Sequence, residues 1–463
     1  MNEIAEQLGT TSLRTLLAAL GDAMARHRAV IQGIQWLVVL FYFSLLIYPA
    51  FLPLPTEYVH FYENLILFAQ FIFWGIWWPF VMLSMMLLGR VWCGVFCPEG
   101  ALTEWASRRG LGRAIPRWMR WSGWPFVAFA MTTIYGQLVS VYEYPKAALL
   151  VLGGSTVAAM IVGFIYGRGK RVWCRHLCPA NGVFAILSRL APIHLHVDRD
   201  AWRAAPHRIA AVDCAPLINI RKMTGNSACH MCGRCSGHRD AVTLGLRSPN
   251  QELLTLPAHE VTRWEVATLV FGVLGIAIGA FQWSASPWFI ALKQLLAAWL
   301  INQNAFVLLQ DNAPWWLLTH YPEVNDVFSW LDGLCILAYI GATTLVLGGA
   351  ILAMLWLAQW LLGAQGAMWR LAYGLTPLAG VSVFLGLSGL TVSMLTAEHL
   401  NMNWVPGARI VLLALGVSWS GWLVWRMIES LATPFWNRLM ATLLVMVGTI
   451  PVVASWLFMY FLW

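Results

Sequence analysis

The chain has 463 residues, of which 59% are hydrophobic and only 11% are charged, with 28 Trp and 22 Phe. A soluble domain usually has about 25% charged residues, so this composition indicates a membrane protein rather than a soluble one. The formal net charge of +8 does not imply nucleic-acid binding, because basic residues beside hydrophobic spans set orientation in a membrane.

Nine apolar runs are long enough to cross a bilayer, which takes about 20 predominantly apolar residues. They lie near residues 31–53, 65–89, 122–142, 147–167, 264–284, 331–362, 371–395, 408–428 and 439–461. The preceding residues 1–30 predict a short amphipathic helix on the membrane surface and show no cleavable signal. The sequence therefore predicts an all-α polytopic membrane protein with about nine transmembrane helices.

Residues 31–167 are expected to hold duplicated two-span units, each followed by a copy of one motif. RVWCGVFCPEG at 90–100 recurs as RVWCRHLCPANG at 171–182, an offset of 81 residues, and each copy follows two apolar runs. This pattern predicts duplicated two-span units. In each C-x3-C-P motif the cysteines share one face if the segment is helical, and the proline would begin or break a helix.

The cysteines of these two motifs are Cys93, Cys97, Cys174 and Cys178. Both motifs emerge at the same membrane face, so the four thiols could converge about a pseudo-two-fold axis. Three interpretations remain open: a second metal centre, redox-active thiol pairs, or inert thiols in a structurally required turn. Arginines beside both motifs would favour thiolates or an anionic cluster, although the positive-inside rule explains them equally well.

Residues 168–263 form the sizeable non-membrane region and carry the strongest chemical signal. Cys214 stands alone, and Cys229, Cys232 and Cys235 follow in a C-x2-C-x2-C run. Three thiolates at this spacing wrap one face of a cubane and Cys214 completes four-sulfur ligation, which predicts a [4Fe-4S] cluster. The alternative is a four-cysteine zinc site, but such sites usually arrive as two C-x2-C pairs. Because apolar content is thin here, we expect the cluster itself to fold a small ferredoxin-like module.

Residues 264–463 are expected to form a C-terminal transmembrane region with an outer amphipathic segment at 288–330. The stretch 288–310 is apolar but carries several polar side chains, including Lys293, so it predicts an amphipathic or re-entrant helix. All eleven histidines lie in expected loops or at span ends. Since membrane haem usually needs histidines facing one another within spans, no haem is predicted.

The distribution of charge predicts the orientation. The segments 90–120 and 168–263 are rich in arginine, whereas the opposite loops carry acidic residues such as Glu143 and Glu323. The positive-inside rule then places the N-terminus and all eight motif cysteines in the cytoplasm of a bacterial inner membrane. Close-spaced cysteines in a reduced compartment are more often metal-binding or redox-active than disulfide-bonded.

At these motifs the chain resembles the NapH/NosR-type membrane proteins, which are polyferredoxin-like. The resemblance covers roughly residues 30–250 and rests on the paired C-x3-C-P repeats on four spans, followed by the cysteine-rich module. The segment CAPLINIR from Cys214 also looks like a degenerate C-P-x-G-I-x-I-R segment of that family. Family members commonly carry two complete four-cysteine runs and two clusters, whereas here the first run survives only as Cys214. The NosR-type flavin domain is not expected, so no flavin is carried over.

The longer form, with its additional C-terminal spans, resembles the FtrD-type membrane ferredoxin of bacterial ferrous-iron uptake systems. That resemblance implies a periplasmic cupredoxin-like or other redox partner and an iron permease. We therefore predict an electron-transfer component, rather than a stand-alone enzyme, that moves electrons between a periplasmic redox partner and the cytoplasm. The alternatives are a quinol-oxidising electron donor to a periplasmic reductase, with quinone as a partner, and a metal-handling or maturation protein that uses the C-x3-C-P cysteines.

Overall fold

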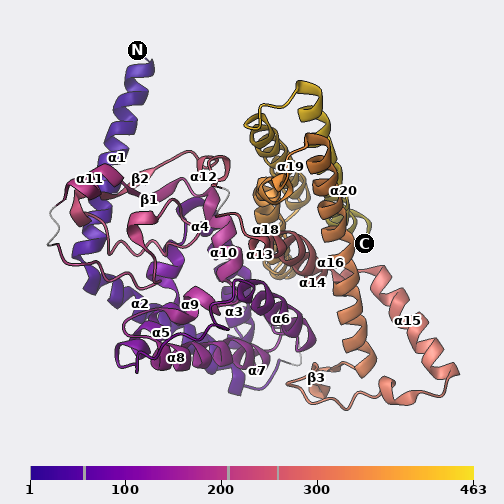
Figure 1. Ribbon diagram of the computed structural model, residues 1–463. Helices are drawn as coiled ribbons and strands as arrows, with labels where there is room; N and C mark the ends of the chain where they lie inside the picture. The colour runs from indigo at the N-terminus through magenta and orange to yellow at the C-terminus, as the bar shows by residue number, and fades with distance from the viewer. Residues whose placement is uncertain (1, 56–58, 206–208, 258–259) are drawn as a thin grey trace. The chain divides into compact units, whose positions relative to one another are not determined.

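The computed structural model describes the chain apart from residues 1, 56–58, 206–208 and 258–259, with side chains described from residue 12 onward. The described residues are mostly helical and contain two short antiparallel strand pairs, which confirms the all-α membrane fold class. They divide into two compact units, each built from three stretches of sequence (Figure 1). Unit 1 comprises residues 1–43, 81–125 and 155–255, and unit 2 comprises residues 44–80, 126–154 and 256–463.

The helices and strands up to residue 255 are α1 (Asn2–Arg26), α2 (Arg28–Ile47), α3 (Leu65–Gln70), α4 (Trp78–Leu88), α5 (Pro98–Arg108), α6 (Trp124–Leu138), α7 (Pro145–Ala148), α8 (Gly154–Tyr166), α9 (Val172–His176), α10 (Asn181–Leu187), β1 (Ile193–Val197), α11 (Arg199–Ala204), β2 (Val242–Leu246) and α12 (Gln251–Leu254). Those that follow are α13 (Arg263–Ala267), α14 (Ile278–Gln282), α15 (Pro287–Asn302), β3 (His320–Tyr321), β4 (Asp326–Val327), α16 (Trp330–Leu362), α17 (Ala367–Ala372), α18 (Thr376–Ala397), α19 (Val405–Glu429) and α20 (Phe435–Leu457).

Eight helical stretches in the described residues are long and apolar enough to cross a membrane. They are Arg28–Phe51, Leu65–Leu88, Pro145–Tyr166, Arg263–Ala285, Trp330–Leu362, Ala367–Ala397, Val405–Glu429 and Phe435–Leu462. The ninth expected span, 122–142, contains α6, which has 15 residues. At 1.5 Å per residue, α6 rises about 22 Å, which is shorter than the roughly 30 Å hydrocarbon core of a bilayer.

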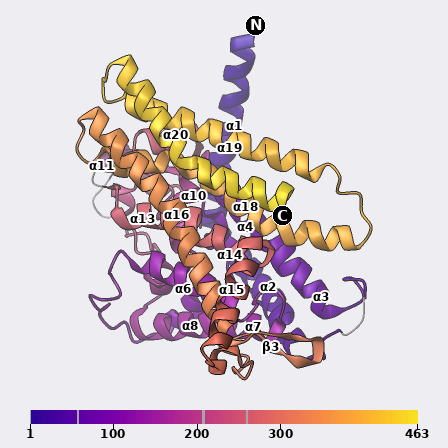
Figure 2. The same ribbon diagram turned by 90° about the vertical axis from the view of Figure 1, so that its right-hand side faces the viewer.

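Unit 2 is dominated by long helices that lie side by side. α16 packs against α20, and α18 packs against α19 (Figure 2). α16 begins at a capping box in which Ser329 Oγ accepts from the Asp332 backbone N–H while the Asp332 carboxylate accepts from the Ser329 backbone N–H. It ends 33 residues later at Gly363, whose φ of 62° allows the left-handed turn that stops a helix.

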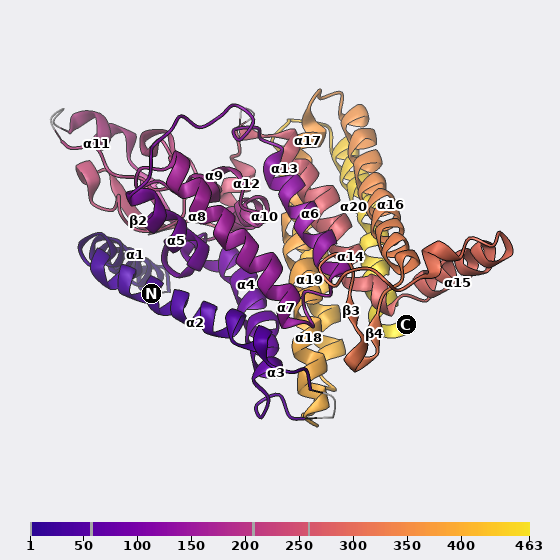
Figure 3. The same ribbon diagram turned by 90° about the horizontal axis from the view of Figure 1, so that it is seen from below.

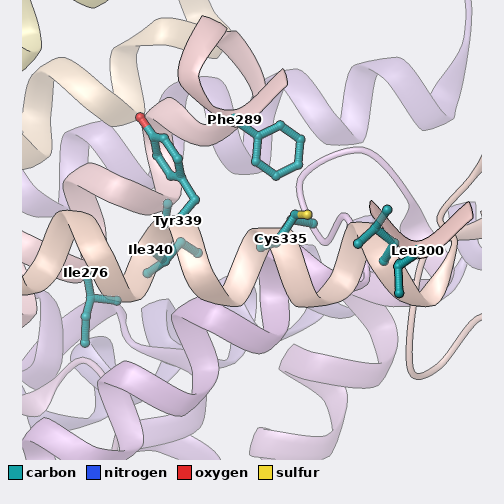
Figure 4. Close-up of a cluster of buried hydrophobic side chains, with 9 residues drawn as sticks. Ile276, Phe289, Leu300, Cys335, Tyr339 and Ile340 are labelled. Atoms are coloured by element: carbon teal, nitrogen blue, oxygen red, sulfur yellow. The ribbon is translucent and has the colours of Figure 1, made fainter. Parts of the chain in front are cut away.

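The stretch expected as an amphipathic or re-entrant helix forms α15, which extends from the end of α14 before the chain returns through β3 and β4 to α16 (Figure 3). Phe289 and Leu300 of α15 pack with Cys335 and Tyr339 of α16 in one buried apolar cluster (Figure 4). Cys335 is fully buried there. Its surroundings account for it as a packing residue.

In unit 1, the strands β1 and β2 close the base of the cysteine-rich loop. They pair antiparallel from Ile193 opposite Leu246 to Val197 opposite Val242, and the Asp198 N–H continues the ladder to the Ala241 carbonyl at 2.8 Å. The 44 residues that the strand pair encloses therefore begin and end at one place, so the small pair fixes both ends of the loop that carries Cys214 to Cys235.

The N-terminal helix α1 packs against this module beside β2 (Figure 1). Leu17 joins the small apolar core that Leu195, Val242 and Leu244 form under the cysteine-rich loop. Asp22 Oδ1 accepts a hydrogen bond from Ser236 Oγ at 2.9 Å. From residue 12 onward, α1 thus supplies part of the core that the module's own sequence lacks.

Candidate metal centre

The four cysteines predicted to ligate a cluster line one cavity. Cys214, Cys229, Cys232 and Cys235 all line one small pocket, whose other walls are mainly apolar side chains of the same loop and of β1. Cys229 and Cys235 are buried, and Cys214 and Cys232 are partly exposed. The structure therefore brings together the four residues that the spacing grouped, around a space of their own.

Left-handed backbone turns shape this cavity. Met231 has φ 51° and Gly233 has φ 71°, one on each side of Cys232, so the chain curls around the thiols. The Met231 N–H donates to Cys229 Sγ at 3.4 Å. Successive turns of this kind aim backbone N–H groups inward and form a concave site for an anion. An anionic iron–sulfur cluster is the kind of group that such a site accepts.

Burial and mutual repulsion keep the cavity thiols protonated unless a cation compensates their charge. Burial raises the pKa of the Cys229 thiol well above its usual range and raises that of Cys235 to about 12, and neighbouring thiolates raise both further. Burial raises the pKa of Cys214 as well, with a further contribution from Cys232. Four adjacent thiolates would repel one another in a buried site. Positively charged iron removes that penalty, because metal binding requires and stabilises the deprotonated thiols.

Zinc and a cubane place different demands on four cysteines. All nine cysteines are free thiols, and within the described residues no three His, Cys, Asp or Glu side chains converge closely enough to hold one metal ion. A structural zinc draws four ligands onto a single atom. A cubane instead takes one thiolate at each of four separate iron corners, which suits cysteines spaced around the walls of a cavity.

The two C-x3-C-P motifs form their local turns as the sequence predicts. Pro98 is the first residue of α5, and Cys97 caps that helix with its Sγ accepting from the Gly100 N–H at 3.4 Å. In the second copy, Cys174 lies in α9 and α10 begins shortly after Cys178. Proline is favoured at the first helical position, where its missing N–H costs nothing.

The thiols of the two C-x3-C-P motifs influence one another's ionisation. Burial raises the pKa of Cys97 and Cys178 well above the usual thiol value and raises that of Cys174 to about 12. Each of these thiols also feels the charges of Cys93 and Glu99. These mutual charge effects place the two motifs within electrostatic range of each other in unit 1.

The two cysteine groups are in direct backbone contact at Gly94. A Cβ atom placed on Gly94 would lie 2.1 Å from the His230 carbonyl oxygen and 2.8 Å from the Cys232 nitrogen. Gly94 follows Cys93 directly, and His230 and Cys232 belong to the C-x2-C-x2-C run. Only a residue without a side chain allows this approach, so the first C-x3-C-P motif rests on the loop that lines the cavity.

A buried carboxylate, Glu104 of α5, ties the same elements together. Its oxygens accept from Arg171 Nε at 2.8 Å and from Arg234 Nη2 in the cysteine-rich loop, while Arg108 approaches at 3.3 Å. Burial alone would raise the pKa of Glu104, but Arg171 and Arg234 hold it below its usual value. The ionised carboxylate therefore links the first repeat, the second repeat and the loop.

Three buried nitrogen atoms in this region have no hydrogen-bond partner among the described residues. They are Arg171 Nη2, Arg90 Nε and His230 Nδ1, and their residues are only 1%, 2% and 1% exposed. A buried donor left without an acceptor is destabilising. Cluster sulfurs accept such N–H groups, so these donors fit an anionic centre beside the cysteines.

Sequence reasoning found both cysteine groups but missed the residues that join them. The sequence marks Arg90 and Arg171 only as basic neighbours of the motifs and His230 as a flank of the cysteine run that could tune a cluster by hydrogen bonding, and it gives no signal for Gly94 or Glu104. The repeated R-V-W-C string marked the arginines. The contacts of the other three depend on segments far apart in sequence.

Comparison with known proteins supports an iron–sulfur assignment. A family described as a 4Fe-4S binding domain matches residues 70–122 and 150–197. These two stretches contain both C-x3-C-P motifs and end before Cys214. The ferredoxin-type protein NapH of Haemophilus influenzae is 28% identical over 178 residues, which cover 34% of this chain and 61% of that protein. In these stretches the chain is thus similar to a 4Fe-4S binding domain and to a NapH ferredoxin-type protein.

The expected [4Fe-4S] cofactor is confirmed by the matching family. The chain spans about three fifths of the length of the curated relative that it matches. No solved structure matches it.

Proposed function

We propose that the protein is an inner-membrane electron-transfer component whose [4Fe-4S] cluster is held by Cys214, Cys229, Cys232 and Cys235. The observation that carries this assignment is the single cavity that all four thiols line. A cluster bound there would exchange one electron at a time. The surrounding residues would then not have to act as a general acid or base. The apolar walls of the cavity limit water around the thiols, and the left-handed turns point backbone donors toward them.

We further propose that Cys93, Cys97, Cys174 and Cys178 hold a second centre. Their mutual proximity, their burial and the unpartnered donors of Arg171 and Arg90 support a negatively charged group at this place. The matched 4Fe-4S binding domain covers these four residues. The backbone contact at Gly94 then makes the two centres neighbours, as an electron path requires.

The proposed membrane topology places both C-x3-C-P motifs on one side of the membrane, with an even number of crossings between them. The electrostatic coupling of Cys97 with Cys174 supports this arrangement. Residues 145–166 supply one span, and α6 is the apolar helix available for the other, with flanking residues completing its length. The arginine-rich segments beside both motifs support a cytoplasmic position for all eight motif cysteines.

The partners are proposed on chemical grounds and by likeness. A cluster-bearing membrane protein fits a role between a periplasmic redox protein and the cytoplasm. The C-terminal spans, with their FtrD-like layout, support a place beside a cupredoxin-like protein and an iron permease in ferrous-iron uptake. In that role, electrons from ferrous iron oxidised outside would pass inward.

Electron transfer across a membrane tests this function directly. The full-length protein is reconstituted into liposomes that contain trapped ferricyanide, with a potassium ionophore to balance charge, and ferrous citrate is added outside. We expect internal ferricyanide to be reduced with the wild-type protein and the Cys335→Ala control, and to stay oxidised with Cys232→Ser. Equal rates in all three samples would refute the proposal.

The same liposomes separate the main alternatives. Reduction of the cluster by menaquinol in the bilayer, with no response to ferrous citrate, would favour the quinol-oxidising role. A metal-handling protein would instead lose its activity on replacement of Cys93 or Cys174 and keep it on replacement of Cys232.

A further inference from the structure

Arg90 and Arg171 occupy equivalent positions in the two repeats, and each guanidinium reaches into the opposite repeat. Arg90 donates to Asn181 Oδ1 at 2.7 Å and to the Ser227 carbonyl at 2.7 Å. Arg171 donates to the Cys93 carbonyl and to Glu104 Oε2. The two arginines thus link the repeats. Of the two side chains, Arg171 is the one that donates to the backbone of a motif cysteine, Cys93.

Arg171 is also joined to the cysteine-rich loop. Its backbone N–H donates to the Ala215 carbonyl at 2.8 Å, next to Cys214. Its charge acts on Cys174 in one cysteine group and on Cys232 in the other. Arg171 therefore lies between the two groups and is bonded to segments that belong to each of them.

One guanidinium nitrogen of Arg171 has no acceptor within the part of the chain that the structure describes. Nε and Nη1 are bonded, whereas Nη2 is buried without a partner on a residue that is 1% exposed. A buried charged donor keeps its place in a fold when an acceptor is present. Sulfur atoms of a bound centre are the anionic acceptors that the neighbouring cysteines would bring.

We propose that Arg171 is a positioning residue shared by two iron–sulfur centres, holding the first C-x3-C-P motif against the cysteine-rich loop and raising the reduction potential of both centres through its charge and its Nη2 N–H. This inference rests on the proposed function, in which both cysteine groups hold centres. A positive charge and hydrogen bonds to sulfur favour the reduced, more negative state, so they raise the potential.

The test compares Arg171→Gln, which removes the charge, with Arg171→Lys, which keeps it. Arg108→Gln is the matched control, because Arg108 also pairs with Glu104 but its side chain is 50% exposed. Full-length proteins are purified without oxygen, their iron and sulfide are counted, and the reduction of each centre is followed by EPR in a potentiometric titration.

At an ambient potential equal to the wild-type midpoint, we expect Arg171→Gln to lower the ratio of reduced to oxidised centre about tenfold. This fall corresponds to a shift of about 59 mV for a one-electron couple. We expect both centres to shift, Arg171→Lys to restore most of the ratio, and Arg108→Gln to match the wild type.

Unchanged potentials in an iron-replete Arg171→Gln protein would overturn the inference, as would equal shifts in Arg171→Gln and Arg108→Gln. If Arg171→Gln loses iron, the Arg171→Lys protein decides between the two roles. Retained iron with nearly wild-type potentials in Arg171→Lys supports the role of the charge. Equal loss of iron in both variants shows a purely structural role. About four irons per wild-type chain with one EPR signal would refute sharing. Wild-type protein without iron and sulfide would refute the proposed function instead.

Discussion

Substitution of Gly94 by alanine is expected to weaken the cysteine-rich loop without touching any cysteine. The new Cβ would meet the His230 oxygen at 2.1 Å, the Cys232 nitrogen at 2.8 Å and the Cys232 Cα at 2.9 Å, all of them backbone atoms. Real Cβ contacts essentially never fall below 3.0 Å, so the loop must move by about 1 Å at its nearest atom. No side-chain rotation relieves such a contact.

Overpacking of this kind costs about 1–3 kcal/mol, which is roughly a 5- to 150-fold change in the population of the intact loop. We expect Gly94→Ala to lose its cluster absorbance faster than the wild type when an iron chelator is added. Gly33→Ala is the matched control, because its Cβ would meet nothing within 4 Å in the same unit. If Gly94→Ala and Gly33→Ala keep the cluster equally long, the close contact between the first motif and the loop is wrong.

Two further predictions concern the buried carboxylates of unit 1. Glu104→Gln breaks a buried ion-pair network with Arg171 and Arg234, so we expect thermal unfolding to show a loss of about 3–5 kcal/mol. Because the pKa of Glu104 is held below its usual value of 4.5 in the folded protein, its contribution to stability is fully present above about pH 4.5 and is lost as the pH falls through the folded pKa. The wild type should therefore lose stability below pH 4.5 more steeply than Glu104→Gln, and parallel pH profiles would contradict this. Gly225→Ala should also destabilise the protein, since its Cβ would lie 2.2 Å from the buried Glu252 carboxyl carbon; an unchanged melting temperature would show that Glu252 can move aside.

Much of the fold and the grouping of the cysteines could be predicted, because these features follow from local patterns. Apolar runs of about 20 residues predicted the long helices. The Cys-Pro order predicted that a helix begins at Pro98. The C-x2-C-x2-C spacing predicted which cysteines share a site, since close spacing alone forces Cys229, Cys232 and Cys235 together. Cys214 joined them through the requirement for a fourth ligand.

What the sequence did not indicate depends on contacts between distant segments. The helical pattern of α1 marked an apolar face, but a pattern does not name its partner, and Leu17 packs under the cysteine-rich loop rather than standing apart from it. Glu104 looked like one acid among many arginines, and only folding places Arg171 and Arg234 around it. Likewise, the apolar run at 122–142 did not reveal that its helix, α6, would have only 15 residues.

The assignment of the cluster to the four cysteines of the cavity is tested most directly by counting iron and acid-labile sulfide per chain, with EPR after dithionite reduction. The wild type and Cys335→Ala are compared with single serine variants of the four cavity cysteines, Cys214, Cys229, Cys232 and Cys235. We predict that each serine variant loses about four irons and four sulfides together with one S = 1/2 signal, while Cys335→Ala keeps them. Full iron and an unchanged signal in the serine variants, or zinc without sulfide in the wild type, would contradict the assignment.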